Sequence, residues 1–163
     1  MGHHTTNPAI KIRHAAADDV DFILSLAPRF VSFELPRGRR KRTTQTAIRA
    51  DIGRALQELR RGEHFFLAID ADAKQIGFLH LRIHRDFFSG ERACHVSDVA
   101  VASMHEGRGV GRALLAYAET WAKAHRCKLM TLSVFPDNSR ARALYDRAGF
   151  NTDLVRMTKP LKP

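Results

Sequence analysis

Three glycines and two arginines stand directly before an apolar helical run in the stretch HEGRGVGRALL, residues 105–115. Glycines let a ligand approach the free backbone N–H groups at a helix N-terminus, where the helix dipole favours an anion. A dinucleotide fingerprint is excluded because Arg112 and Leu114 stand where its third glycine would be, and no Gly-Lys-Ser/Thr follows to make a P-loop. The stretch therefore predicts a loop that binds a diphosphate, with a simple tight turn into the helix as the alternative.

A second group of residues lies downstream, in NSRARALYDRAGF, residues 138–150. Asn138 and Tyr145 are seven residues apart, about two helical turns, so their side chains fall on one face with the small Ala141 between them. Taken alone, Asn138 also fits a helix N-cap and Tyr145 a rim aromatic, and Gly149 ends the helix in either case.

Together the two stretches resemble the GNAT superfamily of N-acyltransferases, from about Ile10 to Lys159. The family pattern R/Q-x-x-G-x-G/A appears as Glu106 to Gly111, and N-x-x-A-x-x-L-Y-x-x-x-G-F is complete at residues 138–150. Glu106 departs from the pattern, because the family usually has Arg or Gln there. A carboxylate facing a diphosphate would repel it, so we expect this side chain to turn to solvent.

The resemblance implies direct transfer of an acetyl group from acetyl-CoA to an amine, with no covalent enzyme intermediate. It places acetyl-CoA between the strands at 93–102 and 128–135, with its pantetheine on the backbone of the first. The N–H of Val101 would stabilise the oxyanion, and Tyr145 would protonate the departing thiolate. The cofactor-binding residues so implied are Val99, Ala100, Val101, Gly107, Arg108, Gly109, Val110, Gly111, Arg112 and Asn138.

The resemblance gives two positions for the base that deprotonates the acceptor amine. One is held here by Ser133, which cannot serve at neutral pH. The other is His95, whose ordinary pKa near 6.5 suits the task. Asp98 is the alternative base, acting directly or through water.

The surrounding sequence predicts one domain over residues 1–163, of the mixed α/β (α+β) class, with residues 1–8 disordered. Apolar alternation marks strands and a 3.6-residue apolar period marks helices, in the order β-α-α-β-β-β-α-β-α-β. The resemblance adds that the sheet is mostly antiparallel and splayed at its centre. The expected strands are 10–14, 64–70, 76–84, 93–102, 128–135 and 151–159, and the expected helices are 18–26, 43–61, 110–125 and 138–149.

A hairpin turn near Phe88 would sort the side chains of its two strands onto opposite faces. Cys94 and His95 then point apart and cannot form a catalytic dyad. The histidines of the polar row have no cysteine or close carboxylate at ligand spacing, so no metal site is expected. The row faces either solvent or an acceptor groove; it pairs His80, Arg82 and His84 with Ala93, His95 and Ser97, while Leu79, Leu81 and Ile83 face Cys94 and Val96.

Charge and composition limit the partners. The net charge is +10 and the pI about 10.4, and the basic loop Arg37–Arg42 would repel a polycation and favour an acceptor with a carboxylate or phosphate. The expected acceptor is the amine of a small molecule or peptide; alternatives are an aminoacyl-RNA substrate, or a non-catalytic basic nucleic-acid-binding protein. No apolar run is long enough for a membrane span, and two cysteines outside any CxxC motif suit the cytoplasm. The oligomeric state is left open, with a homodimer as the common default.

Overall fold

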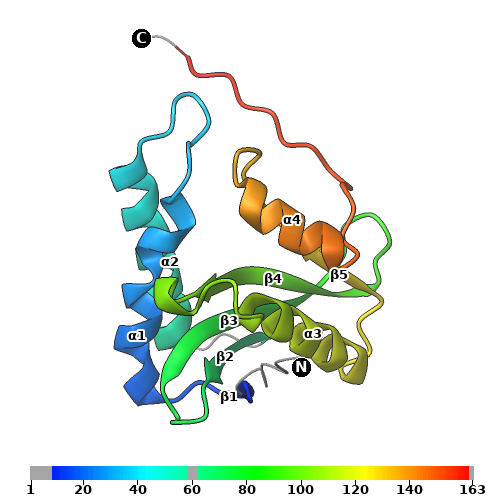
Figure 1. The fold of residues 1–163 in the computed structure, drawn as a ribbon. Helices are drawn as coiled ribbons and strands as arrows, with labels where there is room; N and C mark the ends of the chain where they lie inside the picture. The colour runs from blue at the N-terminus through cyan, green and yellow to red at the C-terminus, as the bar shows by residue number, and fades with distance from the viewer. Residues whose placement is uncertain (1–8, 59–61, 162–163) are drawn as a thin grey trace, which may run out of the picture.

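The computed structural model describes residues 9–58 and 62–161, and it places a single five-stranded sheet at their centre (Figure 1). The strand order is β1-β2-β3-β4-β5; the first four strands pair antiparallel and β5 lies parallel to β4. The predicted mixed, mostly antiparallel class is confirmed. The strands are β1 Lys11–His14, β2 Glu63–Ile69, β3 Gln75–Arg85, β4 Arg92–Val101 and β5 Leu129–Leu132.

Helices cover both faces of the sheet (Figure 1). Alternate residues of a strand point to opposite faces, so Phe66 and Leu79 pack against α3 while Phe65 and Phe78 pack against α1 and α2. Because both faces are covered, β2 and β3 are buried over most of their length. The α-helices are α1 Val20–Ser25, α2 Lys41–Glu58, α3 Val110–Ala124 and α4 Ser139–Arg147, with short 3₁₀ turns η1 Ala17–Asp19, η2 Ala27–Val31 and η3 Ser103–His105.

β4 is irregular where it passes the middle of the sheet. Its pairing with β3 shifts by one residue at Ser97, so His80 lies opposite Asp98 and the two side chains share a face. The predicted register is right from Ala93 to Val96 and wrong beyond it, because alternation alone cannot place a bulge. β5 pairs with β4 only as far as Leu132, so β4 has no described strand partner on that side from Ser97 onward. This divergence is the splay that the sheet was expected to show.

Two predicted strands differ from the structure. The strand expected at 128–135 is shortened to Leu129–Leu132, because the chain leaves β4 at that point. The strand expected at 151–159 is not formed. Residues 151–161 run exposed beyond α4 (Figure 1), and an alternating pattern makes a strand only where another strand accepts its hydrogen bonds.

Some expectations fall outside the described residues. The disorder expected for residues 1–8 lies there, as does the end of the helix expected at 43–61, of which α2 accounts for Lys41–Glu58. No helix within 9–58 and 62–161 is both long and apolar enough to cross a bilayer.

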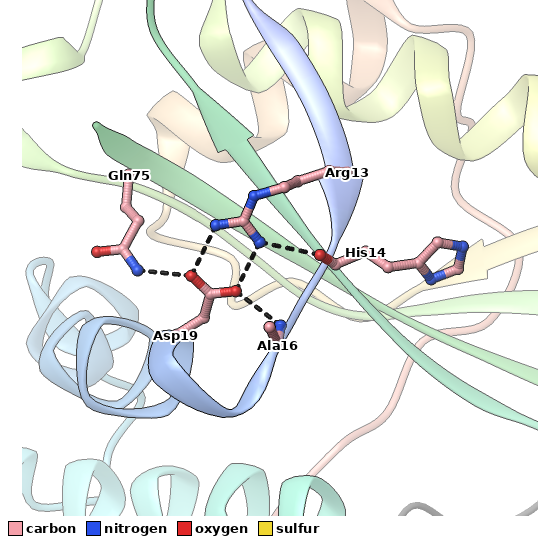
Figure 2. Close-up of polar contacts among 5 residues, drawn as sticks. All are labelled: Arg13, His14, Ala16, Asp19 and Gln75. Carbon is pink, nitrogen blue, oxygen red and sulfur yellow. Dashed lines mark hydrogen bonds and ion pairs between the residues drawn. The ribbon is translucent and has the colours of Figure 1, made fainter. Parts of the chain in front are cut away.

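A buried carboxylate joins β1, η1 and β3. Asp19 is 2% exposed and accepts hydrogen bonds from both terminal nitrogens of Arg13 at 2.7 and 2.9 Å, and from Gln75 Nε2 at 2.6 Å (Figure 2). The backbone N–H of Ala16 donates a further bond at 2.7 Å. These bonds, led by that from Arg13, outweigh burial and lower the pKa of Asp19 from 3.8 to about 2.

The Asp19 cluster makes stability depend on pH. Since the folded-state pKa is below the unfolded value, the carboxylate stabilises the fold above pH 3.8, and this contribution disappears as the pH falls toward 2. We expect Asp19→Asn to lower the free energy of unfolding by about 2 kcal/mol at pH 7, measured by urea denaturation. The difference from wild type should vanish near pH 2. Exposed Asp18→Asn is the control, and an equal loss in both variants would contradict the role given to Asp19.

Candidate active site

The glycine-rich loop leads from η3 into the N-terminus of α3. Gly107 and Gly109 have φ values of 71° and 82°, a left-handed conformation that glycine adopts without strain, and Gly109 is the N-cap of α3. No side chain caps this helix, and its first intrahelical bond runs from Ala113 N to Gly109 O at 2.9 Å. The preceding N–H groups of the first turn are therefore free to bind an anion.

Gly111 has a different role from the other two glycines. A β-carbon at this position would meet Leu144 Cδ2 at 3.0 Å, so the missing side chain lets α3 and α4 pack closely. A β-carbon at Gly107 would meet nothing within 4 Å. The absent side chain of Gly111 therefore serves helix packing, and the expectation that the three glycines clear room for a ligand stays a prediction.

Glu106 does not turn to solvent as the sequence suggested. Its carboxylate is paired with Arg29 of η2 and with Arg140 of α4, and it is only 22% exposed. Two guanidinium groups neutralise one carboxylate, so the loop keeps a positive balance. Arg108 and Arg112, both exposed, have no described ion pair and add to it.

β4 ends at Val101, before this loop, and Arg140 near the start of α4 contacts the loop through Glu106. Val99 and Val101 pack on the α3 side of the sheet, and Ala100 packs on the other. Asn138 is the N-cap of α4, its Oδ1 accepting from Ala141 N at 3.2 Å. That bond occupies the oxygen and leaves the amide NH₂ available, so Asn138 caps a helix and can still donate to a ligand.

Tyr145 lies on α4, and its side chain packs against the α3-side core. Burial, followed by the negative charge of Asp98, raises the pKa of Tyr145 from 10.0 to about 12. The phenol therefore keeps its proton throughout the physiological range.

Asp98 belongs to a polar pocket of about 200 Å³ between α2 and the α2-facing side of β2, β3 and β4. His80 is 3% exposed, stacks on Phe65 at 3.9 Å between ring centroids, and places Nδ1 2.8 Å from Asp98 Oδ2. With the Nδ1 proton donated to this carboxylate, Nε2 carries the lone pair. His80 Nε2 is buried and has no hydrogen-bond partner among the described residues. The pocket is lined by Asp51, Arg54, Ala55, Glu58, Glu63, His80, Arg82, His95, Ser97 and Asp98.

His95 lines the same pocket, as the sequence expectation of an acceptor groove requires. Its Nδ1 lies 2.8 Å from Thr131 Oγ1 on β5. Burial, then the positive charges of Arg82 and His84, lower the pKa of His95 from 6.5, so the ring is neutral at pH 7.

Other reactive groups are excluded from this pocket. Cys94 faces the α3-side core with no exposed surface, and burial raises the pKa of its thiol to about 12. A protonated, enclosed thiol is no nucleophile. Within 9–58 and 62–161, no three His, Cys, Asp or Glu side chains are grouped so as to hold a metal ion.

The sequence profile of the acetyltransferase (GNAT) family matches residues 29–150. The chain belongs to this family. It is therefore an acyltransferase, and the resemblance seen in its two motifs is confirmed.

Similar proteins agree with this assignment. Aminoglycoside N(6')-acetyltransferase type 1 of Stenotrophomonas maltophilia is 30% identical over 103 residues, which cover 60% of this GNAT chain and 67% of that protein. A tetramutant of the BH1408 protein from Bacillus halodurans has the same fold, with a TM-score of 0.75 at 21% identity over 93% of this chain and 99% of that one. The aminoglycoside N-acetyltransferase AAC(6')-Iy, solved with a CoA-linked bisubstrate analogue, gives 0.66 at 19% identity over 95% and 99%.

Two residues that line the pocket, His80 and Glu63, were not predicted to have a catalytic or binding role. His80 stood in the predicted polar row, but only the bulge at Ser97 brings it against Asp98. Glu63 begins β2 next to Gly62, where the sequence shows a helix stop and no sign of a site. One sequence signal for Glu63 was available. Glu63 stands two and four residues before the apolar Phe65 and Leu67, so all three side chains lie on the same face of the strand.

The Glu106 contacts can be tested through stability. We expect Glu106→Gln to lower the free energy of unfolding by roughly 1 kcal/mol in low salt and by less in high salt, because the three groups are partly exposed and screened. Glu119→Gln is the control; it removes the more exposed pair with Lys123 and should cost about 0.3 kcal/mol. If urea denaturation gives the same loss of unfolding free energy for both variants, the contacts of Glu106 with Arg29 and Arg140 do not stabilise the fold more than an exposed surface pair does.

Proposed function

We propose that this protein is an N-acetyltransferase that passes an acetyl group from acetyl-CoA directly to a primary amine of a small molecule or peptide. The observation that carries the proposal is the parting of β5 from β4 beyond Val96, with Asp98 in a polar pocket on one face of the sheet and Tyr145 packed against the α3-side core on the other. Release of free CoA thiol across a panel of amines, amino acids, aminoglycosides and peptides tests it. A rise in melting temperature with acetyl-CoA tests donor binding separately.

The donor side is supported by the loop and by the edge of β4. The N–H groups of Val110, Gly111 and Arg112 in the first turn of α3, with Gly107 and Gly109, offer a diphosphate site beside the positive charge of Arg108. Backbone groups of Val99, Ala100 and Val101 lack a strand partner toward β5 and can pair with an amide-bearing chain such as pantetheine. The amide NH₂ of Asn138 can donate to the same ligand. A backbone N–H here, that of Val101 in our proposal, stabilises the oxyanion of the tetrahedral intermediate.

Tyr145 is proposed as the acid that protonates the departing CoA thiolate. Transfer from a phenol whose pKa is about 12 to a thiolate of cysteine-like pKa near 8.5 is uphill by ~3.5 units, about 5 kcal/mol. That lies well within a barrier of roughly 16 kcal/mol for about ten turnovers per second. The proton transfer is therefore affordable, although the raised pKa of Tyr145 makes it costlier than for a free phenol.

Removing the Tyr145 hydroxyl tests this step. We expect Tyr145→Phe to lower kcat by about 100-fold, the usual size of general acid catalysis, with little change in acetyl-CoA affinity. Tyr117→Phe, the chain's other tyrosine, is the control, because its ring packs with the α3-side core. An unchanged kcat in Tyr145→Phe, under conditions where chemistry limits the rate, would remove Tyr145 from the mechanism.

The base is proposed to be an imidazole of the polar pocket. His95 and Asp98 were the sequence candidates, and the contact of Asp98 with His80 favours an indirect role for this carboxylate. Asp98 holds the Nδ1 proton of His80, so that Nε2 can take a proton from the acceptor amine. His95 is the second imidazole of the pocket and, being neutral, does not repel an ammonium group.

Matched substitutions separate the two imidazoles. We expect His80→Gln to lower kcat/KM by about 100-fold and Asp98→Asn to do the same by misorienting the ring, while His95→Gln costs less. His14→Gln, outside the pocket on β1, should leave kcat/KM unchanged. If His95→Gln abolishes activity and His80→Gln does not, the base is His95. Activity then falls only at a pH below the ordinary imidazole value of 6.5, because the lowered pKa of His95 keeps the ring neutral to a lower pH.

A further inference from the structure

Glu63 is a buried carboxylate whose contacts are incomplete. Its side chain is 9% exposed, and Oε2 has no hydrogen-bond partner among the described residues. Oε1 lies 3.9 Å from Arg82 Nη1, too far for a hydrogen bond, and the Arg82 side chain is 52% exposed. Leaving a buried carboxylate oxygen without a donor destabilises the fold unless another donor arrives.

Asp19 shows what a structural buried carboxylate looks like in the same chain. Both of its oxygens are satisfied, by Arg13, Gln75 and the N–H of Ala16 (Figure 2). Glu63 has no comparable set of donors among the described residues. Its side chain lines the polar pocket, so the pocket is where a missing donor would sit.

Two further buried polar atoms, on residues that line the pocket, also have no hydrogen-bond partner in the described part of the chain. They are His80 Nε2, on a residue that is 3% exposed, and Ser97 Oγ. The lone pair of the imidazole and the carboxylate both accept hydrogen bonds, and the hydroxyl can accept as well as donate. The pocket therefore fits a ligand rich in N–H groups, while a carboxylate ligand would meet like charge.

The described lining of the pocket is acidic, opposite in sign to the chain. Among the residues that the structure describes, four carboxylates and two guanidinium groups line it, although the chain carries +10 overall. The basic loop lies at the far end of α2: Asp51 is ten residues along the helix from Lys41, about 15 Å. That exceeds the roughly 8 Å screening length at physiological salt. The loop therefore lies too far along α2 to set the charge preference of this pocket, and the expectation that it favours an anionic acceptor stays a prediction.

We propose that Glu63 binds a second, protonated amine of the acceptor, and that the acceptor is a diamine, polyamine or diamino sugar. This rests on the proposed function, with the reacting amine at His80 Nε2. Glu63 lies opposite Arg82 and is thus the diagonal neighbour of His80 on one face of the sheet, with β-carbons about 7 Å apart. The two nitrogens of the acceptor are separated by several bonds, and the second keeps its charge while the first is acetylated.

Three acceptors with the same four-carbon chain test the inference: 1,4-diaminobutane, butylamine and 4-aminobutyrate. In wild type, kcat/KM for CoA release should be about 10- to 100-fold higher for the diamine than for butylamine, the range expected for one charged hydrogen bond, and lowest for 4-aminobutyrate. In Glu63→Gln the advantage of the diamine should disappear, while butylamine is used nearly as before. Glu91→Gln, an exposed acid outside the pocket, should keep the wild-type ratio.

A second variant and a binding measurement keep the test decisive. Arg82→Gln removes the cation that competes for Glu63, so the diamine advantage should grow, opposite in sign to Glu63→Gln. The melting temperature should rise with 1,4-diaminobutane more than with butylamine at matched ionic strength, and Glu63→Gln should cancel the difference. If this shift is seen but no amine is acetylated, the amine site stands and the proposed function fails. If diamine and monoamine are acetylated equally, or the preference survives in Glu63→Gln, the inference is overturned and the proposed function stands.

Discussion

The site depends on one feature of the sheet, the parting of β5 from β4 while β4 stays paired with β3. β4 keeps its antiparallel partner to Val101 but loses its parallel partner after Val96. Backbone groups in the middle of a sheet are thereby left without a strand, at a cost that a bound chain or solvent must offset. The bulge at Ser97 falls at the same place and turns Asp98 toward His80. One irregular strand thus borders both the edge proposed for the acetyl donor and the pocket proposed for the acceptor.

Both faces of the sheet carry a packed apolar cluster, and the α2-facing side also carries the polar pocket. Fully buried side chains such as Phe66 and Leu114 on the α3 side and Phe78 on the other side each contribute roughly 1.5–3 kcal/mol by burial. In the pocket, His80 and Glu63 each have a buried atom with no hydrogen-bond partner among the described residues, at a cost of about 1–3 kcal/mol each. Since a domain is stable by only about 5–15 kcal/mol, such a pocket requires the well-packed clusters on both faces. The contrast with the fully bonded Asp19 shows that the fold can satisfy a buried acid where binding is not needed.

The sequence predicted the parts of the molecule that local pattern determines. Periodicity and turn residues located the four strands before α3, α3 itself and α4, and the motifs at Glu106–Gly111 and 138–150 identified the family. The polar row on β3 and β4 was also predicted, because side chains alternate strictly along regular strands. What failed was non-local. The strand at 151–159 had the right alternation but no partner in the described chain, and the contact of His80 with Asp98 depends on a bulge that alternation cannot place.

Glu106 shows why a departure from a family pattern cannot be judged from its own charge. A carboxylate at the mouth of a diphosphate loop should weaken binding if it faces the ligand. Here Arg29 from η2 and Arg140 from α4 converge on it, two segments more than a hundred residues apart in sequence. Glu106 thus connects η2, which precedes α2, to α4, the helix that carries Tyr145. Because the cluster has two positive groups for one negative, the residue that looked discordant leaves the loop cationic, and fixes the position of α4 over it.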